Sequence, residues 1–205
     1  MTPAGRLLDA ALEEHLQVVR QAVVSQRRQL LRAAETIAAC LAAGGKVLLF
    51  GNGGSAADAQ HIAAEFVNRF RADRPPLAAL ALTTDASVMT SIANDARFEE
   101  VFARQVRALG RPGDVAWAFS TSGASPNVLA AVAAARATGL FTIALTGRGG
   151  PLASAADLAL RVDSADTPRI QEAHGLIGHL ICALVEERLF PDAPPQAGRE
   201  PSPQP

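Results

Sequence analysis

Lysine is almost absent from this sequence, and arginine carries nearly all of the positive charge. Lys46 is the only lysine, and the formal net charge of the 205 residues is −1. Domains that bind nucleic acids usually carry a clear excess of basic residues. We therefore expect no nucleic-acid partner.

Cysteines are few, and long hydrophobic runs are missing. Cys40 and Cys182 both lie in apolar stretches of helical composition. We expect both to be buried free thiols, as is usual in cytosolic proteins. The sequence leaves a disulfide between them open. No uncharged apolar run reaches the roughly 20 residues of a membrane-spanning helix, and no signal-peptide hydrophobic segment follows the N-terminus. We expect a cytoplasmic protein with no membrane partner.

The length of the chain suits one domain with a full core. Apolar residues recur at helical spacing up to residue 43, with a break expected near Ser25, and Gly44-Gly45 ends the pattern. Residues 1–43 are therefore an expected N-terminal helical arm, which could pack on its own domain or on another subunit; we favour the second. The proline-rich residues 191–205 lack the apolar content for a core, so we expect a disordered tail.

Between these ends, over residues 44–190, strand patterns alternate with helical ones. Strands are expected at residues 46–50, 77–82, 114–119, 141–146 and 158–162, and helices at 55–69, 87–92, 98–109, 126–138 and 167–189. Such alternation is typical of an α/β domain, here a five-stranded parallel sheet flanked by helices on both faces. Ligands of such sheets bind at the carboxyl ends of the strands.

The first strand runs into the glycine-rich segment Gly51-Asn52-Gly53-Gly54-Ser55, and a helix follows. Glycines allow a close approach to a ligand, and the free N–H groups of a helix N-terminus attract anions, so a phosphate site is indicated. One alternative is a tight turn without a ligand. Another is dinucleotide binding, because Gly51, Gly53 and Ala56 fit G-x-G-x-x-A. That motif needs an acidic residue at the end of the next strand, and the first acid there, Asp85, comes too late.

A second polar loop, Ser120-Thr121-Ser122-Gly123-Ala124-Ser125, follows the third strand. One hydroxyl is enough to cap the helix after it, yet four are present. Two such loops at the carboxyl edge of a parallel sheet suggest one phosphorylated ligand held from both sides. The loop does not match G-x-S-x-G, so nothing marks a nucleophilic serine.

Histidines on two helices are the candidates for chemistry. His61 and Glu65, at i and i+4, share a helix face. They form a surface pair, a metal-ligand pair or an acid–base pair. On the last helix Gly175 and Gly178 lie between Gln171 and His179, which are about 12 Å apart along the axis. These glycines admit either a close helix neighbour or a substrate. We interpret the remaining candidates as structural: His15, Glu172, His174 and Cys182.

Taken together, these motifs resemble the sugar isomerase (SIS) domain family, and specifically its phosphoheptose isomerases. The resemblance covers nearly all of residues 44–189 and the helical arm. It rests on Gly51-Asn52-Gly53-Gly54-Ser55, His61 with Glu65, Asn94-Asp95, Ser120-Thr121-Ser122-Gly123, Ser125, Leu145-Thr146-Gly147, and Arg169-Ile170-Gln171-Glu172 with His179. Ala124 departs from the asparagine common in relatives but leaves the loop hydroxyls in place.

The resemblance implies isomerisation of sedoheptulose 7-phosphate to D-glycero-D-manno-heptose 7-phosphate through an enediol(ate), for heptose-containing glycoconjugates. It further implies a cytoplasmic homotetramer with active sites at subunit interfaces and one zinc ion per subunit. Glu65 is the candidate base, and His179 the candidate for proton delivery. The implied zinc ligands are His61, Glu65, Gln171 and His179. The implied substrate contacts are Asn52, Gly53, Gly54, Ser55, Glu65, Asn94, Asp95, Ser120, Thr121, Ser122, Ser125 and Gln171.

Two other functions are compatible with the same fold. One is a non-catalytic SIS protein that binds the bacterial replication initiator, which this chain resembles over parts of residues 68–113. That relative lacks the acid at the position of Glu65 and the imidazole at the position of His179, so the enzyme is favoured. The other is a sugar-phosphate-sensing regulator, which usually carries an N-terminal DNA-binding domain. The arm here has neither the length nor the basic charge for that role.

Overall fold

A computed structural model describes residues 2–194 of the chain. Its centre is a five-stranded parallel sheet in the order β2-β1-β3-β4-β5, which confirms the predicted fold class. The strands are β1 (Val47–Gly51), β2 (Ala79–Ala81), β3 (Val115–Ser120), β4 (Phe141–Thr146) and β5 (Leu158–Arg161). Gly51 at the end of β1 pairs with Phe119 near the end of β3, so the loops that follow these two strands leave the sheet side by side.

The second strand is shorter than the predicted residues 77–82. The N–H of Leu77 donates to the carbonyl of Phe66 at the end of a helix, at 3.0 Å, instead of joining the sheet. The ladder with β1 therefore begins only at Ala79.

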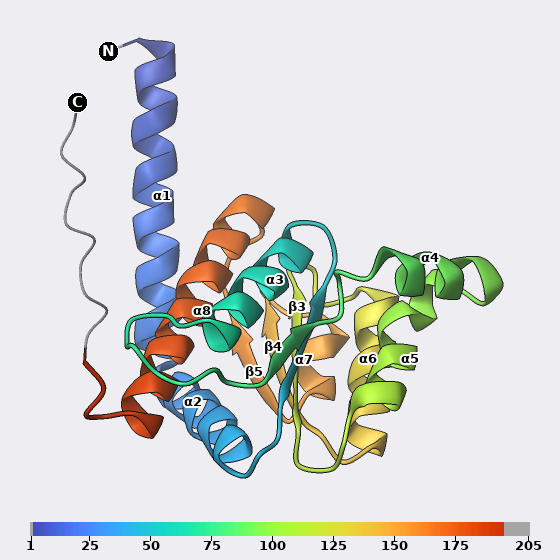
Figure 1. Ribbon diagram of the computed structural model, residues 1–205. Coiled ribbons are helices and arrows are strands. Elements are labelled where there is room, and N and C mark those ends of the chain that lie inside the picture. The colour runs from blue at the N-terminus through green and yellow to red at the C-terminus, as the bar shows by residue number, and fades with distance from the viewer. Residues whose placement is uncertain (1, 195–205) are drawn as a thin grey trace, which may run out of the picture.

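Helices cover both faces of the sheet, as predicted (Figure 1). On one face lie α1 (Pro3–Ser25), α2 (Arg27–Ala42), α3 (Gly54–Val67) and α8 (Thr167–Leu189). On the other lie α4 (Ala86–Asp95), the 3₁₀ turn η1 (Phe98–Glu100), α5 (Val101–Leu109), α6 (Pro126–Ala137) and α7 (Pro151–Ala155). Along β3, Trp117 and Phe119 point to the α8 face, whereas Ala116 and Ala118 point to the α6 face. This alternation is the period of two that a strand imposes on its side chains.

The first helix of the arm, α1, projects well beyond the domain, whereas α2 packs on it (Figure 1). The arm breaks between Ser25 and Arg27, close to the expected position. In the middle of α1, Arg169 of α8 donates to the carbonyl of Ala11 at 2.6 Å, and His15 Nδ1 lies 2.7 Å from Glu172 Oε2. His15 and Glu172 thus join α1 to α8.

The outer part of the arm carries leucines that the other described residues leave exposed. Leu7 and Leu8 are each 71% exposed, and Leu12 and Leu16 are at least half exposed. The arm therefore leaves an apolar stripe open.

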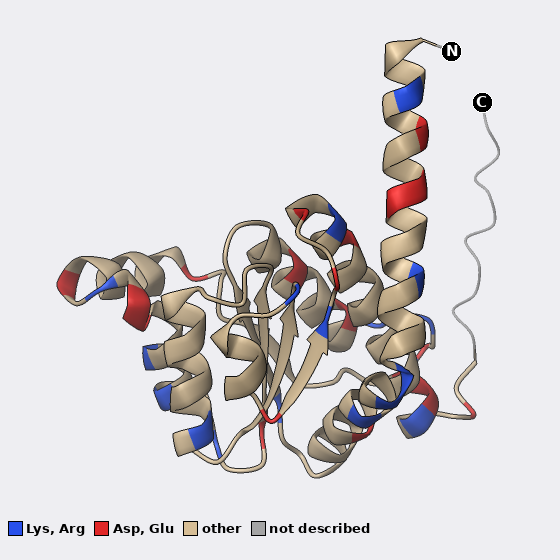
Figure 2. Ribbon diagram, turned by 180° about the vertical axis from the view of Figure 1, so that it is seen from behind, with Lys and Arg blue, Asp and Glu red and all other residues tan. Residues whose placement is uncertain are grey.

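At the amino edge of the sheet, an ion pair joins the starts of β1 and β3. The Asp114 carboxylate accepts from Lys46 Nζ at 2.5 Å and from the backbone N–H groups of Lys46 and Arg111. The only lysine of the chain is thus held at the end of the sheet opposite the candidate loops. Elsewhere, residues of both charge signs occur along α1 and over the domain (Figure 2).

Cys40 and Cys182 are both buried and unpaired, in line with the expected free thiols. Among the described residues, no helix combines the length and the apolar character needed to cross a membrane.

Most of the predicted tail lies outside the described residues, which end at Pro194. The carbonyl of Pro194 accepts a hydrogen bond from the N–H of Asp73, at 3.1 Å. The disorder predicted for residues 191–205 stays a prediction.

Candidate active site

The first candidate loop is shaped by glycines at two positions, Gly53 and Gly51, where a side chain would strain the backbone or clash. Gly53 has a φ of 57°, a left-handed conformation that favours glycine. At Gly51 a Cβ atom would lie 2.8 Å from the carbonyl oxygen of Phe119, so glycine is needed for β1 and β3 to approach this closely. The loop then leads directly into α3, whose first N–H groups face the carboxyl edge of the sheet.

An asparagine that the sequence reasoning missed fixes this loop to α6. Asn52 and Asn127 exchange two side-chain hydrogen bonds, each of 2.8 Å. Asn127 is buried. The available signal was an amide in the first turn of an otherwise apolar helix. This reciprocal pair ties the two candidate loops to one another.

The second loop is held by its own hydroxyl groups. Ser120 Oγ lies 3.2 Å from Ser125 Oγ and 3.5 Å from Ser122 Oγ, and it accepts a hydrogen bond from the N–H of Gly123. Ser122 Oγ accepts from the N–H of Ala124. The hydroxyls predicted to hold a phosphate are therefore gathered at the N-terminus of α6, although Ser120 itself is buried.

A cleft of about 480 Å³ opens between the two loops and η1. Its lining combines amides, a hydroxyl and charged groups: Asn52, Arg97, Phe98, Glu99, Ser125, Pro126 and Asn127. Arg97 brings a guanidinium into a cleft whose two loops contain no cationic residue, and its Nε lies 3.5 Å from Glu99 Oε2. The sequence reasoning missed Arg97 and Phe98, which follow Asn94-Asp95 without a distinctive pattern.

Two imidazoles and a carboxylate converge on the α8 face. His61 and Glu65 of α3 and His179 of α8 each offer a ligand atom, and these atoms all lie within 4.8 Å of one another. His61 Nε2 is 2.7 Å from His179 Nε2 and 3.5 Å from Glu65 Oε1. The structure thus brings together three of the four predicted zinc ligands. This nitrogen and oxygen donor set is one that zinc accepts in proteins.

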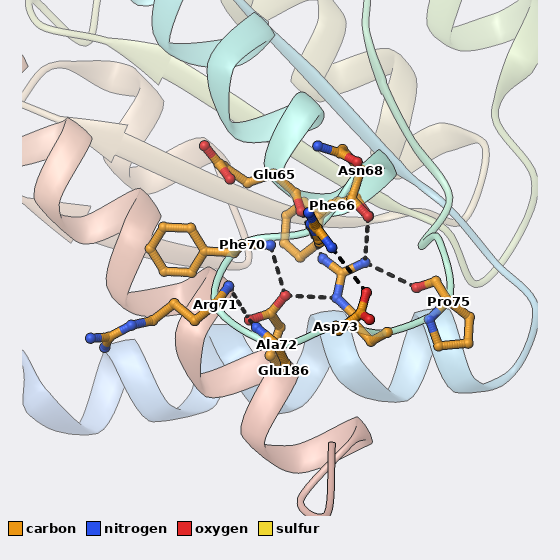
Figure 3. Close-up of polar contacts among 11 residues, drawn as sticks. Glu65, Phe66, Asn68, Phe70, Arg71, Ala72, Asp73, Pro75 and Glu186 are labelled. Carbon is orange, nitrogen blue, oxygen red and sulfur yellow. Dashed lines mark hydrogen bonds and ion pairs between the residues drawn. The ribbon is translucent and has the colours of Figure 1, made fainter. Parts of the chain in front are cut away.

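An aromatic ring supports the second imidazole. Phe70, in the segment after α3, stacks on His179 with ring centroids 5.2 Å apart and an interplanar angle of 12°. Figure 3 shows Phe70 on the same side of the segment as Glu65. The sequence reasoning missed Phe70, because the surrounding Arg-Phe-Arg does not match the pattern of a functional site.

Gln171, the fourth predicted ligand, lies against the first loop. A Cβ atom at Gly54 would be 2.2 Å from Gln171 Nε2, so the amide occupies the space that the missing side chain leaves. Gly54 precedes His61 by two helical turns. A ligand role for Gln171 stays a prediction.

The two glycines on α8 have different neighbours. Gly178 packs against Ile62 of α3, with a Cβ position only 2.5 Å from Cδ1 of Ile62, which is the close helix neighbour considered above. Apart from its own helix backbone, no atom of the described residues lies within 4 Å of the Cβ position of Gly175. The open space on this face of α8 therefore lies at Gly175, between Gln171 and His179.

Asn94 and Asp95 belong to the last turn of α4, whereas the helix predicted from the sequence ends at residue 92 and leaves both residues in the connection to the next helix. Both are exposed, and Asn94 Nδ2 donates to Asp95 Oδ1 at 2.8 Å. Figures 1 and 2 show α4 projecting to one side, away from α3 and α8. The predicted contact of these two residues with substrate stays a prediction.

Burial shifts the pKa of two groups near the site. Asp58, one turn before His61, has a buried Oδ2 without a hydrogen-bond partner, and burial raises the pKa of its carboxyl despite the attraction of His61. Burial lowers the pKa of His174 to about 4, while its ring nitrogen donates to the carbonyl of Thr146. His174 is therefore neutral and structural, as the sequence indicated.

Phosphate-type loops at the carboxyl edge of a doubly wound sheet, on a domain that also brings a carboxylate and two imidazoles together, are typical of one class of protein. That class comprises enzymes that bind a phosphorylated substrate and transfer a proton on it. The SIS domain family matches residues 12–147.

Similar proteins narrow the class. Phosphoheptose isomerases of Solidesulfovibrio magneticus and Desulfovibrio desulfuricans are 54% and 57% identical to this chain, over 91% and 84% of it and 92% and 83% of their own lengths. The structure of a phosphoheptose isomerase from Neisseria gonorrhoeae is 44% identical and aligns with a TM-score of 0.85, covering 90% of this chain and 99% of that one. The chain belongs to the SIS domain family and, within it, to the phosphoheptose isomerases. None of these comparisons supports the alternative of an initiator-binding protein.

Proposed function

We propose that this protein interconverts sedoheptulose 7-phosphate and D-glycero-D-manno-heptose 7-phosphate. The observation that carries the proposal is the convergence of Glu65, His61 and His179 within 4.8 Å, on a domain whose two loops are suited to a phosphate. The sugar class comes from the phosphoheptose isomerases to which the chain is similar.

The reaction moves one proton between two carbons. A base removes a proton from C1 of the ketose while O2 gains a proton, which gives an enediol. A proton then returns to C2 and the O1 hydroxyl loses its own, which leaves the aldehyde at C1. We assign the base to Glu65, whose side chain is only 20% exposed, and proton delivery to His179.

The two loops hold the phosphate end, so that C1 and C2 lie beside these side chains. Backbone N–H groups at the starts of α3 and α6, with the hydroxyls of Ser120, Thr121, Ser122 and Ser125, would bind the phosphate oxygens. Binding energy at this remote end fixes the orientation of the reacting carbons.

A zinc ion fits the same cluster, with His61, Glu65 and His179 as ligands and Gln171 as the fourth. When bound, such an ion stabilises negative charge on a sugar oxygen. A carboxylate that binds zinc is a weaker base, so the two roles of Glu65 compete. The metal site is supported by the donor set, because two imidazole nitrogens and a carboxylate oxygen from three side chains all lie within 4.8 Å of one another.

We further propose a cytoplasmic homotetramer with active sites at subunit interfaces. Two features support the assembly: the exposed leucines of α1, and an apolar groove of about 560 Å³ between α1, α2 and α8, lined in part by Val24, Leu31 and Leu180. A neighbouring subunit would also explain why Asn94 and Asp95 lie away from α3 and α8. The buried free thiols fit a reducing compartment.

Incubation of the purified protein with sedoheptulose 7-phosphate, followed by NMR detection of an aldoheptose phosphate, tests the activity. Glu65→Gln removes the base without changing the shape of the side chain and should abolish turnover. Glu35→Gln, an exposed carboxylate next to Arg188, is the matched control. Unchanged turnover in Glu65→Gln would contradict the assigned role.

Metal dependence is tested by dialysis against a strong chelator, with measurement of activity and thermal stability before and after zinc is restored. We expect at least one of the two to fall and to recover with zinc. Indifference of both to the chelator would refute the metal site.

A further inference from the structure

A buried ion pair lies directly behind the candidate catalytic groups. Arg74 and Glu186 have side chains that are 1% and 4% exposed, and Arg74 Nε lies 2.7 Å from Glu186 Oε1 (Figure 3). We propose that this pair is a positioning device that fixes Glu65 and His179 relative to each other. The inference rests on the proposed function and adds residues to it.

Arg74 fixes the end of α3. Its Nη2 donates to the backbone carbonyl of Glu65 at 2.7 Å, and Nη1 donates to the carbonyls of Phe66 at 2.9 Å and Pro75 at 3.0 Å (Figure 3). Carbonyls in the last turn of a helix have no partners within the helix. The guanidinium supplies those partners, so the turn that carries Glu65 has a defined end.

Glu186 fixes the segment that follows. Its two carboxylate oxygens accept from the backbone N–H groups of Phe70 at 2.9 Å, Arg71 at 2.8 Å and Ala72 at 3.1 Å. Burial opposes ionisation of this carboxyl, but these three donors and Arg74 outweigh it and hold its pKa below the usual value. The carboxylate is therefore charged at neutral pH and orders the segment.

The ordered segment places the ring of Phe70 on His179. Phe70 is the first of the three residues that donate to Glu186, and its ring stacks on the imidazole at 5.2 Å. Glu186 lies on α8, two turns after His179, so the same helix carries both the carboxylate and the imidazole. Arg74 thus acts on Glu65 through the backbone, and Glu186 acts on His179 through Phe70.

An apolar pair of similar volume would not hold the backbone of residues 65–75 in place. Replacing a buried ion pair by well-packed apolar residues is often neutral or stabilising, so stability alone gives little reason for such a pair. Apolar side chains, however, would leave the backbone N–H and carbonyl groups of residues 65–75 without these partners. What the pair supplies is a fixed path for this segment.

The experiment compares four variants of the full-length protein, each supplied with zinc. Arg74→Lys keeps the charge but loses the planar fork, and Phe70→Leu removes the stacked ring. Lys46→Arg is the control, because it exchanges lysine for arginine, also with the charge kept, in the ion pair with Asp114 at the opposite edge of the sheet. Phe70→Tyr tests rescue by a second aromatic ring. Steady-state kinetics gives kcat and KM, and the ¹H NMR signals of the His179 ring report whether an aromatic ring still stacks on it.

We expect kcat to fall by roughly ten- to a hundredfold in Arg74→Lys and Phe70→Leu, with KM within about threefold of the wild-type value. Lys46→Arg should keep wild-type kcat, and Phe70→Tyr should recover most of the kcat that Phe70→Leu loses. The His179 ring signals should move downfield in Phe70→Leu, where the ring current is lost, and also move in Arg74→Lys.

Wild-type kcat and unmoved His179 signals in Arg74→Lys would overturn the proposal. Equal losses of kcat in Arg74→Lys and Lys46→Arg would also overturn it, by showing a general effect on stability. If the wild-type protein turns over no heptose phosphate, the proposed function fails. The NMR measurement on Arg74→Lys then still decides whether the Arg74–Glu186 ion pair sets the stacking of Phe70 on His179.

Discussion

Substitution of a single glycine should separate activity from stability. Gly54 is the first residue of α3 and does not have a positive φ, so its backbone can accept alanine. An alanine Cβ would lie 2.2 Å from Gln171 Nε2, whereas ordinary van der Waals contact begins at 3.4 Å. The Gln171 amide must therefore move by about 1.2 Å, a displacement that a flexible side chain can make.

Gly54→Ala is expected to lower the activity and to maintain or raise the stability of the folded state. Misplacement of a functional group by about 1 Å can cost roughly 100-fold in rate, which is about 2.7 kcal/mol of activation free energy. Alanine in place of glycine reduces the freedom of the unfolded chain and favours the folded state by about 0.4–1 kcal/mol. Gly54→Ala should thus lower kcat/KM by roughly 100-fold while the midpoint of thermal unfolding holds or rises.

The control is a double-mutant cycle. If Gly54→Ala acts by displacing Gln171, it should cause little further loss in a Gln171→Ala background, because the displaced group is already gone. Kinetics of the two single variants and the double variant, with metal content measured in each, checks this. Additive losses would refute the reasoning and indicate that the new methyl group obstructs the substrate directly.

Three further results are expected. Burial lowers the pKa of His174 from 6.5 to about 4, so between these pH values the folded state binds fewer protons than the unfolded state. About 3 kcal/mol of unfolding free energy should therefore be lost as the pH falls from 6.5 to 4. Urea unfolding of His174→Gln should show a flatter dependence of stability on pH. Arg97→Gln should raise KM by about tenfold with little change in kcat, because the cleft loses its guanidinium, and Arg136→Gln on the outside of α6 should change neither constant. Burial, followed by the charge of Asp114, raises the pKa of the Cys40 thiol to about 11, and burial, followed by the charge of Glu65, raises the pKa of the Cys182 thiol. A disulfide reagent at about pH 8 should therefore label neither thiol before the protein is denatured.

The sequence was informative about the order of the elements and much less so about contacts across the fold. Strand and helix patterns have local periods, so the parallel sheet and the break near Ser25 could be predicted. His61 and Glu65 were recognisable because they lie one turn apart on one helix. Asn127, Phe70 and Arg97 were missed, since each takes its role from a partner that the chain brings close only after folding.

The two α8 glycines show the same limit. The pattern of Gly175 and Gly178 left both a helix neighbour and a substrate open. The structure assigns Ile62 to Gly178 and open space to Gly175. Which of two equivalent glycines faces a neighbour depends on the angle between α3 and α8, and no local pattern encodes that angle.

The position of the only lysine has a chemical consequence. Open-chain sugars carry a free carbonyl, and lysine amines condense with such carbonyls to form Schiff bases, the first step of glycation. Lys46 is held by Asp114 where β1 and β3 begin, whereas the loops of the site follow the ends of these strands. A heptose phosphate bound at these loops meets no lysine side chain of its own subunit. The sugar ring can open and the carbonyl can rearrange there without forming a covalent adduct with this residue, because the only lysine of the chain lies at the opposite end of the sheet.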